Sequence, residues 1–581
     1  MSTAGPATAG FVKLALKAHS LNTAGVSYFG TRVPSADLPG KPLLRLALFA
    51  GMALAVSSAS VAAQEMRPPR ITTVRADWPA AIASLSDPDA LKPVFVRARY
   101  RNARRPIPPV LSRLNAVMVQ RLPGLASSPV PVLLPFDTVA LMRDQAAGTA
   151  AADNDRYLAG FSTRTFFFPG PSGYDAALAI RTADIAELSD ITFPVPISVQ
   201  ISGSALLYEL DEASTVEGAP VPELEAAFPG IRRMILEHNL RYTFVRFGVP
   251  YVVSVTCFDA GRARFKMPTC RDADRVARRF LGALRIVGGT PQVRRPADPL
   301  PIERPAVQSP VFSFHPPGRI LTGTGFRGQG GRSDNTVYAQ IRFPIGETPA
   351  FANSQMFQKR NPTSNYGFPW RDNFCERRGF PVSQCPAGIG HQGQDIRAMP
   401  CQPAPNENRC VPHNPVVAVR DGAILRAPKQ EAVYLVVNTA TERIRFRYLH
   451  MRPIKMDSDN LLSGRLVNEG EVIGEISNFD KHEAGTSYHL HFDVQVPTRH
   501  GWVFVNPYMT LVSAYERLIG ARGEQINDPT QLANADPSST AAIGTTRSDV
   551  EPQIVRHKRA GKRAAHKTRK HKRYEIGRAH V

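Results

Sequence analysis

The chain has 581 residues, of which 71 are Lys or Arg and 49 are Asp or Glu, so its formal net charge is +22. Hydrophobic residues make up 43% and charged residues 21%, which is typical of globular proteins and excludes a wholly disordered chain. The length corresponds to roughly two to four domains. Only one stretch is apolar enough to enter a bilayer, which excludes a multi-span membrane protein.

That stretch, residues 43–56, reads LLRLALFAGMALAV and is shorter than the ~20 residues that a spanning helix needs. Lys41 and Arg45 flank its start, and the small residues Val61-Ala62-Ala63 follow it. This pattern predicts a secretory signal peptide, with a buried core helix as the alternative. We therefore assign residues 1–63 to a leader and signal peptide. The leader is long, and a translation start nearer Val33 or Leu38 would account for its length.

The cysteine pattern also indicates export. The six cysteines fall into three sequence-close couples: Cys257 and Cys270, Cys375 and Cys385, and Cys401 and Cys410. The spacing alone leaves many connectivities open. Pairing within each couple is the simplest, because each bond would close a small loop in an oxidising compartment. Zinc-finger ligation is disfavoured because the sequence contains no CxxC.

The first half of the mature chain predicts an α+β domain. Residues 64–109 are rich in Arg and Pro and are expected to form an exposed lead-in. Within residues 110–289, Ile197, Val199 and Ile201 alternate as in a strand, and residues 242–258 predict two strands around Gly248-Val249-Pro250. Residues 274–286 predict an amphipathic helix. No catalytic set is recognisable in this domain, and its role stays open.

Eight prolines within residues 290–318 predict a semi-rigid linker. In residues 319–520, short alternating segments such as RIRFRYLHM and YHLHFDVQV are separated by turn residues, which predicts an antiparallel β domain. The expected fold class is thus multidomain, with an α+β N-terminal domain and a mainly antiparallel β C-terminal domain.

Residues 521–581 are expected to form a disordered basic tail. Residues 551–581 hold eleven Lys or Arg against two Glu, a net charge of +9. Such a tail either attaches to an anionic polymer or is merely solvated. No nucleic-acid recognition motif accompanies it, so no specific nucleic-acid partner is expected. Residues 575–581, EIGRAHV, back-translate to the start of a common DNA-sequencing adapter, so we expect them to be a sequencing artefact.

A first candidate metal-binding motif is His391-Gln392-Gly393-Gln394-Asp395. The neighbouring glycines make a helix unfavourable, so the motif is expected in a loop that enters a strand. Imidazole and carboxylate are both zinc ligands, and a turn at Gly393 would bring them onto one ion. A surface hydrogen bond is the ordinary alternative for such a pair.

A second candidate is His489-Leu490-His491. Strand alternation places His489, His491 and Asp493 on one face and apolar residues on the other. Two neighbouring imidazoles on one face indicate a metal site or a solvent-facing pair.

A third candidate is His450, at the end of RIRFRYLHM. Alternation places it with Ile444, Phe446 and Tyr448, opposite Arg443, Arg445 and Arg447, so it is expected to point into the domain. A core histidine that is satisfied by a backbone group is the alternative for an isolated residue.

Together, the H-x-G-x-D, Y-L-H and H-L-H-F-D-V segments, in that order, closely resemble the lysostaphin/LytM-type zinc metallopeptidases over about residues 388–496. The resemblance implies one zinc ion held by His391, Asp395 and His491, with His450 and His489 as catalytic histidines. Residues 399–415 look like an insertion and residues 478–487 replace the family's small-residue turn. Both lie near the expected groove and bear on substrate preference.

Three protein ligands leave zinc a fourth position for water, as in catalytic sites. No HExxH glutamate is present, so we assign His489 as the general base and His450 as the donor to the oxyanion. The resemblance implies a secreted zinc endopeptidase of peptidoglycan stem peptides or cross-links, in the periplasm or cell envelope of a bacterium. The basic tail would bind an anionic envelope polymer. The alternative function is a catalytically silent LytM-like adaptor that activates another cell-wall hydrolase.

Overall fold

A computed structural model describes residues 65–85, 109–151, 155–191, 193–210, 218–236, 239–259, 267–291, 301–321, 331–354, 365–398 and 414–526. These residues lie within one compact unit, residues 61–581. The signal peptide, the Cys401–Cys410 couple and the basic tail beyond residue 526 lie outside the described residues. None of the described helices is both long and apolar enough to cross a membrane.

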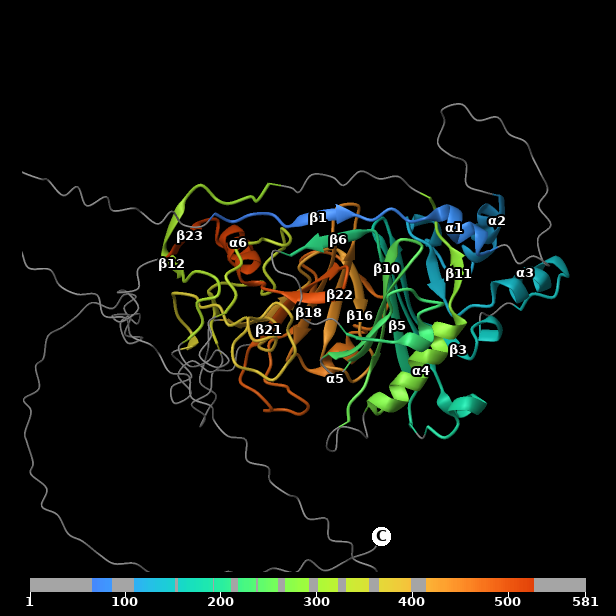
Figure 1. The fold of residues 1–581 in the computed structure, drawn as a ribbon. Helices are drawn as coiled ribbons and strands as arrows, with labels where there is room; N and C mark the ends of the chain where they lie inside the picture. Colours follow the sequence, from blue (N-terminus) through green and yellow to red (C-terminus); the bar gives the residue numbers. More distant parts are fainter. Residues whose placement is uncertain are drawn as a thin grey trace, which may run out of the picture. The chain divides into compact units, whose positions relative to one another are not determined.

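The N-terminal half contains a seven-stranded antiparallel sheet, in which the strands follow the order β3-β4-β5-β10-β9-β8-β7 (Figure 1). Its strands are β3 (Phe161–Gly170), β4 (Gly173–Ile180), β5 (Ile197–Ser204), β7 (Ala219–Pro220), β8 (Arg232–Leu236), β9 (Asn239–Arg246) and β10 (Val249–Thr256). The short pair β2 (Val132–Leu134) and β11 (Arg285–Gly288) accompanies the helices α1 (Trp78–Ala83), α2 (Pro109–Met118), α3 (Thr138–Ala146) and α4 (Cys270–Ala283).

Helix α4 is amphipathic, as the sequence predicted, but it begins four residues earlier than expected. Its apolar face packs on β5, β9 and β10 of this sheet. The earlier start has a local cause, because Thr269 is the N-cap and its side chain accepts a hydrogen bond from the Asp272 backbone N–H. Val276, Phe280 and Leu281 are fully buried.

The predicted pair of strands within residues 242–258 is confirmed as β9 and β10. The turn between them is Phe247-Gly248, and both residues have positive φ, 53° and 72°. It therefore lies one residue before the expected position, and Val249 and Pro250 belong to β10. Positive φ at both turn residues matches the twist of a two-residue hairpin.

Two of the three expected disulfides lie within the described residues, and both are formed. Cys257 bonds Cys270 and Cys375 bonds Cys385, as nearest-neighbour pairing predicted. The first bond joins the end of β10 to the start of α4, and the second closes the loop that precedes His391. These four cysteines are therefore not zinc-finger ligands.

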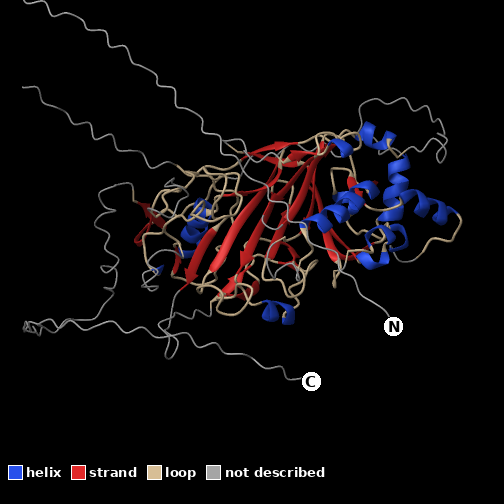
Figure 2. Ribbon diagram, turned by 60° about the horizontal axis from the view of Figure 1, so that its bottom comes forward, coloured by secondary structure: helices blue, strands red, loops and turns tan. Residues whose placement is uncertain are grey.

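The C-terminal half contains an eight-stranded antiparallel sheet, which confirms the expected β architecture (Figure 2). The strands follow the order β13-β14-β21-β18-β17-β16-β19, and β22 pairs with β21. They are β13 (Ala350–Ala352), β14 (Gln394–Ala398), β16 (Gly422–Leu425), β17 (Val433–Asn438), β18 (Arg443–Leu449), β19 (Leu466–Val467), β21 (Leu490–Thr498) and β22 (Gly501–Val505). This half also contains the pair β15 (Pro415–Val417) and β20 (Val472–Glu475) and the helices α5 (Pro453–Ser458) and α6 (Tyr508–Ile519).

The predicted lead-in and the predicted linker both contribute strands. In the lead-in, β1 (Arg70–Thr73) pairs with β6 (Leu206–Glu209). In the predicted linker, β12 (Gln308–Phe314) pairs in parallel with β23 (Arg522–Gln525), which lies in the predicted tail. The alternating apolar side chains of Phe312 and Phe314 are buried, and Pro310 is tolerated because β12 belongs to a two-stranded pair. The expectation of a linker without strands is wrong for β12, and that of a disordered tail is wrong for β23. The residues of β1 are exposed or half-buried, which agrees with an exposed lead-in.

The two large sheets contact each other through β3 and β4 of the first sheet and β16 to β18 of the second. Phe166 and Ala177 pack with Leu425 and Val436 in one apolar cluster. Beside this cluster, the Asn438 side-chain amide donates a hydrogen bond to the Gly173 carbonyl oxygen at 3.0 Å. The seven-stranded sheet therefore covers part of the eight-stranded sheet.

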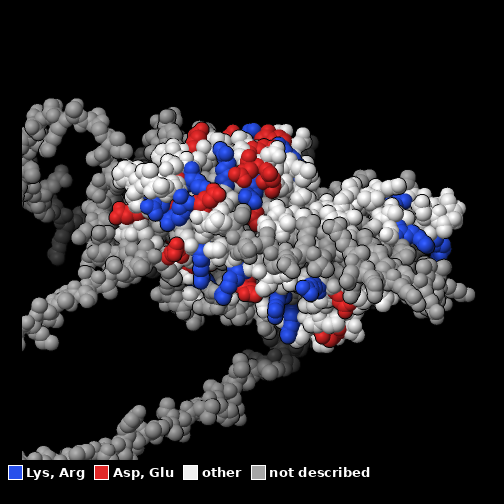
Figure 3. Space-filling model, turned by 90° about the horizontal axis from the view of Figure 1, so that it is seen from above, with Lys and Arg blue, Asp and Glu red and all other residues white. Residues whose placement is uncertain are grey.

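Charged side chains of both signs are interspersed on the face of the molecule shown in Figure 3. That face therefore presents no large basic patch among the residues that the structure describes. Of the net charge of +22, a share of +9 lies in residues 551–581, outside the described part of the chain.

Candidate metal centre

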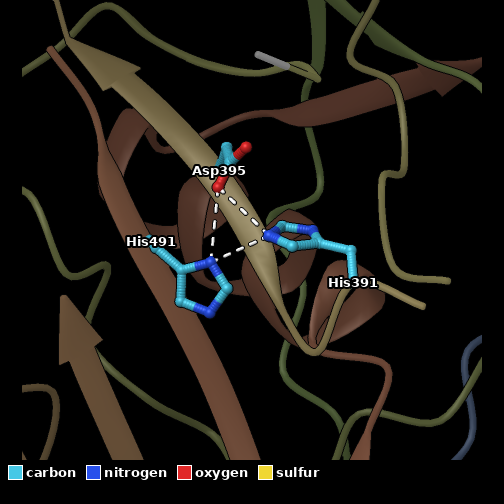
Figure 4. Close-up of side chains that lie close together, drawn as sticks. All are labelled: His391, Asp395 and His491. Carbon is cyan, nitrogen blue, oxygen red and sulfur yellow. Dashed lines mark hydrogen bonds and ion pairs between the residues drawn. The ribbon is translucent and has the colours of Figure 1, made fainter. Parts of the chain in front are cut away.

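The candidate metal centre lies where β14 and β21 pair. Asp395 of β14 is directly opposite His491 of β21, and His391 lies in the loop that enters β14 (Figure 4). Gly393 makes this loop possible, because a Cβ atom there would lie 2.3 Å from the carbonyl oxygen of Phe492. The expected loop-into-strand position of the first motif is thus confirmed.

Three side-chain atoms converge at this point. His391 Nε2 lies 2.9 Å from His491 Nδ1, and Asp395 Oδ1 lies 3.4 Å from each of these nitrogens (Figure 4). All three side chains are buried. Within the described residues, this is the one group of three His, Cys, Asp or Glu side chains with the geometry to hold a metal ion.

The hydrogen bonds of the two histidines decide which nitrogens face the centre as acceptors. His391 Nδ1 lies 3.0 Å from the Asn373 carbonyl oxygen, which can only accept, so Nδ1 carries the proton. His491 Nε2 lies 3.3 Å from Asp493 Oδ2 and donates in the same way. The unprotonated nitrogens, His391 Nε2 and His491 Nδ1, therefore point at each other.

Two nitrogen lone pairs and a carboxylate oxygen repel one another unless a cation lies between them. Asp395 Oδ1 is buried and makes no hydrogen bond to any described residue, which is costly for a carboxylate oxygen. Tetrahedral zinc with ligands at about 2.0–2.1 Å separates its ligand atoms by roughly 3.3 Å. The observed separations of 2.9 to 3.4 Å are close to this value. The residues present therefore fit a zinc ion.

Asn373 supports both of the candidate ligands on the β14 side, and no motif in the sequence indicates this role. Besides its carbonyl contact with His391, its side chain donates to Asp395 Oδ2 at 3.0 Å and accepts from the Asp395 backbone N–H at 3.1 Å. The second carboxylate oxygen is thereby occupied, and Oδ1 is left for the centre. Asn373 lies in an irregular segment 18 residues before His391, where no periodicity could have indicated it.

Burial and neighbouring groups shift the pKa values of the three converging residues. Burial alone would raise the pKa of Asp395, but His391 and His489 hold it well below its usual value. Burial lowers the pKa of His391 to about 3, despite the nearby Asp395. Burial also acts to lower the pKa of His491, but the neighbouring carboxylates of Asp395 and Asp493 raise it overall. Asp395 is thus ionised and His391 neutral, as metal ligation requires.

The two other predicted histidines lie next to this group. His489 bridges to Ser477 one residue before β21, and its Nε2 lies 3.4 Å from Asp395 Oδ1. The ring centroid of His450 lies 4.6 Å from that of His489 and 6.2 Å from that of His491. All five predicted site residues are therefore gathered in one place.

His450 points into the domain as expected, beside the buried His489 and His491, but the strand face expected for it is wrong. Strand β18 ends at Leu449, and His450 has a left-handed backbone with φ of 69°. Continued alternation would have put His450 on the apolar strand face that carries Tyr448. The left-handed residue breaks the alternation, so the ring lies beside His489 and His491 instead.

An antiparallel sheet that carries a buried His-Asp-His group and two further histidines has the architecture expected of a LytM-type peptidase domain. Residues 406–507 match the sequence profile of peptidase family M23. This region of the chain is therefore an M23 peptidase domain, which confirms the predicted relationship. The match includes His450, His489 and His491 and begins after His391 and Asp395. No curated protein matches the chain.

Solved structures with detectable similarity cover only part of the chain. A protein from Ruminococcus gnavus that is assigned as a glycyl-glycine endopeptidase, lytM, is 21% identical with a TM-score of 0.20, over 32% of this chain and 63% of that one. Csd3 from Helicobacter pylori is 17% identical with a TM-score of 0.16, over 34% of this chain and 40% of that one. A second crystal form of Csd3 is 10% identical with a TM-score of 0.14, over 57% and 56%. The chain thus spans less than two thirds of each of these structures.

Proposed function

We propose that this chain is an exported zinc-dependent endopeptidase that hydrolyses peptide bonds of cell-wall peptidoglycan. The observation that carries the proposal is the convergence of His391, Asp395 and His491 beside His450 and His489. The M23 peptidase domain supports the reaction class. The bound zinc would supply an activated water and polarise the scissile carbonyl.

The ligand atoms in this proposal are His391 Nε2, Asp395 Oδ1 and His491 Nδ1. Each is held from behind by a second group, Asn373 for the first two and Asp493 for the third. Such support fixes the ring orientation and the tautomer of each histidine before the metal binds.

In the proposed reaction, His489 is the general base. Its Nδ1 lies 2.7 Å from the Ser487 carbonyl oxygen and therefore donates to it. Its Nε2 is buried and makes no hydrogen bond to any described residue, so a lone pair is directed at the centre. This nitrogen can accept a proton from the attacking water and release it to the leaving amine.

His450 can act as the oxyanion donor only when both of its nitrogens are protonated. Its Nδ1 lies 2.8 Å from the Phe479 carbonyl oxygen and donates there, which leaves Nε2 for the substrate. In neutral imidazole Nε2 is an acceptor. The proposed role of His450 therefore requires the imidazolium form when the oxyanion develops.

Export is proposed from two features. The two disulfides would persist in an oxidising compartment such as the cell envelope, and residues 43–56 have the pattern of a signal peptide. The basic tail is proposed to attach the enzyme to an anionic envelope polymer.

The proposal can be tested on the purified chain from residue 64 onward. We expect about one zinc ion per chain, and release of soluble fragments from peptidoglycan that stops with a chelator and returns with added zinc. His489→Ala, which keeps the three ligands, is the matched inactive control. Zinc binding without any hydrolysis would favour the adaptor function, and chain that neither binds zinc nor cleaves peptidoglycan would contradict the proposal.

A further inference from the structure

One face of β18 carries three arginines that the proposed reaction does not use. Arg443, Arg445 and Arg447 alternate with the apolar residues that face the core, as the sequence indicated. All three are buried, with exposed fractions of 0%, 8% and 8%. A guanidinium stays charged when it is buried, so each of the three needs an anionic or polar partner.

The first two arginines pair with the seven-stranded sheet. Arg443 Nη1 lies 2.6 Å from Asp175 Oδ2, and Arg445 pairs with the other oxygen of the same carboxylate. The Arg445 guanidinium also lies 4.0 Å from the ring centroid of Trp502. These contacts hold the two sheets together and involve none of the five predicted site residues.

The third arginine pairs with Asp493, next to the candidate metal centre. Arg447 and Asp493 are directly opposite each other in β18 and β21, and Arg447 Nε lies 2.5 Å from Asp493 Oδ2. Arg447 Nη2 donates to Gln392 Oε1 at 3.0 Å, and Gln392 directly follows His391. A single guanidinium thus contacts both segments that carry the proposed ligands.

Asp493 also contacts His491, so the position of its carboxylate affects the orientation of the His491 ring. The carboxylate oxygen that receives Arg447 also lies 3.3 Å from His491 Nε2, and the other oxygen accepts from Gln495 Nε2 at 3.3 Å. Because the carboxylate accepts the Nε2 proton, Nδ1 of His491 is left unprotonated and faces Asp395. Carboxylates behind metal-bound histidines commonly fix the tautomer and the ring orientation in this way.

We propose that Asp493 and Arg447 form a positioning pair, which fixes the tautomer and orientation of His491 and holds the Gln392 loop against β21. Asp493 acts through His491, and Arg447 acts through Asp493 and Gln392, so both are positioning residues and neither is catalytic. The inference rests on the metal site of the proposed function and extends it to residues outside the ligand set.

The test uses the zinc-loaded chain from residue 64 onward and the near-isosteric variant Asp493→Asn. Zinc affinity is measured by competition with a chromophoric chelator, and ligand geometry by the visible absorption of the cobalt(II)-substituted protein. We expect Asp493→Asn to weaken zinc binding roughly 10- to 100-fold and to change the cobalt spectrum. Asp175→Asn is the matched control, since it alters a buried Asp–Arg contact on the same strand face. It should lower the melting temperature and leave both metal readouts unchanged.

A second variant, Asp493→Asn combined with Arg447→Met, avoids leaving an unpaired buried guanidinium and should weaken zinc binding to a similar degree. Wild-type zinc affinity and an unchanged cobalt spectrum in folded Asp493→Asn would overturn the inference. Loss of folding in both variants would also overturn it, because the pair would then serve the core. If the wild-type chain itself binds no zinc, the proposed function fails as well. Zinc binding and hydrolysis by the wild type, with no effect of Asp493→Asn, would remove only this inference.

Discussion

Asp395 and His491 face each other across β14 and β21, with Asp395 Oδ1 3.4 Å from His491 Nδ1. Their proximity is therefore set by the register of two antiparallel strands. Because side chains alternate between faces, a shift of one residue would move His491 to the opposite face of the sheet. The candidate centre thus depends on the sheet being paired correctly before any metal binds.

Substitution of a proposed metal-binding histidine and of a proposed catalytic histidine should have different effects on zinc binding. His491→Ala is expected to abolish zinc binding and hydrolysis together, because it removes one of the three proposed ligands. His489→Ala should keep zinc and lower the turnover rate roughly 100- to 10,000-fold, because it removes only the proposed general base. Metal analysis and muropeptide release, measured on the same samples, check the expected effects of both substitutions. Stoichiometric zinc in folded His491→Ala protein would contradict the ligand assignment.

Asn373→Ala should weaken zinc binding roughly 10- to 100-fold while the fold is kept, because Asp395 loses the donor to its second oxygen. Chelator competition measures the effect. Asn353→Ala is a suitable control, since Asn353 is also buried and its side chain bonds the Asn365 and Gly367 carbonyl oxygens instead. Equal losses of affinity in the two variants would show that Asn373 has no specific role.

Reduction of Cys375–Cys385 should weaken zinc binding before the eight-stranded sheet unfolds. The Cys375 backbone N–H donates to the His391 carbonyl oxygen at 2.9 Å, so loosening this disulfide loop frees the segment that carries His391. The double variant Cys375→Ser/Cys385→Ser tests this by chelator competition and circular dichroism. Cys257→Ser/Cys270→Ser is the control and should leave zinc affinity unchanged. Loss of zinc affinity in the Cys257/Cys270 variant but not in the Cys375/Cys385 variant would contradict the expectation.

Asp175→Ala should destabilise the fold by about 3–5 kcal/mol, because it leaves Arg443 and Arg445 buried without their carboxylate partner. Urea unfolding measures the free energy. Asp190→Ala is the control, since Asp190 forms an exposed ion pair with Arg275 and should change stability little. A negligible effect of Asp175→Ala would show that the contact between the sheets does not depend on this charge.

The stabilisation by Asp175 should also depend on pH. Burial would raise the pKa of this carboxyl, but Arg443 and Arg445 hold it below its usual value. The folded state therefore binds this proton less readily than the unfolded state does. The contribution is fully present above an unfolded pKa of about 4 and is lost as the pH falls towards the lower folded value. The stability difference between wild type and Asp175→Asn should narrow over that range.

Local patterns in the sequence predicted much of the site. Alternation within β21 correctly predicted that His491 and Asp493 share a face, and the glycines before Asp395 indicated the loop that enters β14. What depends on contacts between distant segments was not predictable. Asn373 acquires its role only when its irregular loop lies against β14, and the left-handed backbone of His450 moves its ring off the strand face that alternation had given. The Pro-rich spacing around β12 likewise concealed a strand whose partner lies more than 200 residues away.

Because Arg443 and Arg445 are buried against Asp175, the M23 region is not expected to be stable when it is expressed without the seven-stranded sheet. A fragment that begins after the seven-stranded sheet would expose two cationic side chains to water and lose the apolar cover on Leu425 and Val436. The newly exposed surface would be apolar as well as charged, and the fragment would tend to aggregate. Transplanting or expressing the M23 region intact therefore requires its neighbour from the same chain, and chimaeras should be joined outside both sheets.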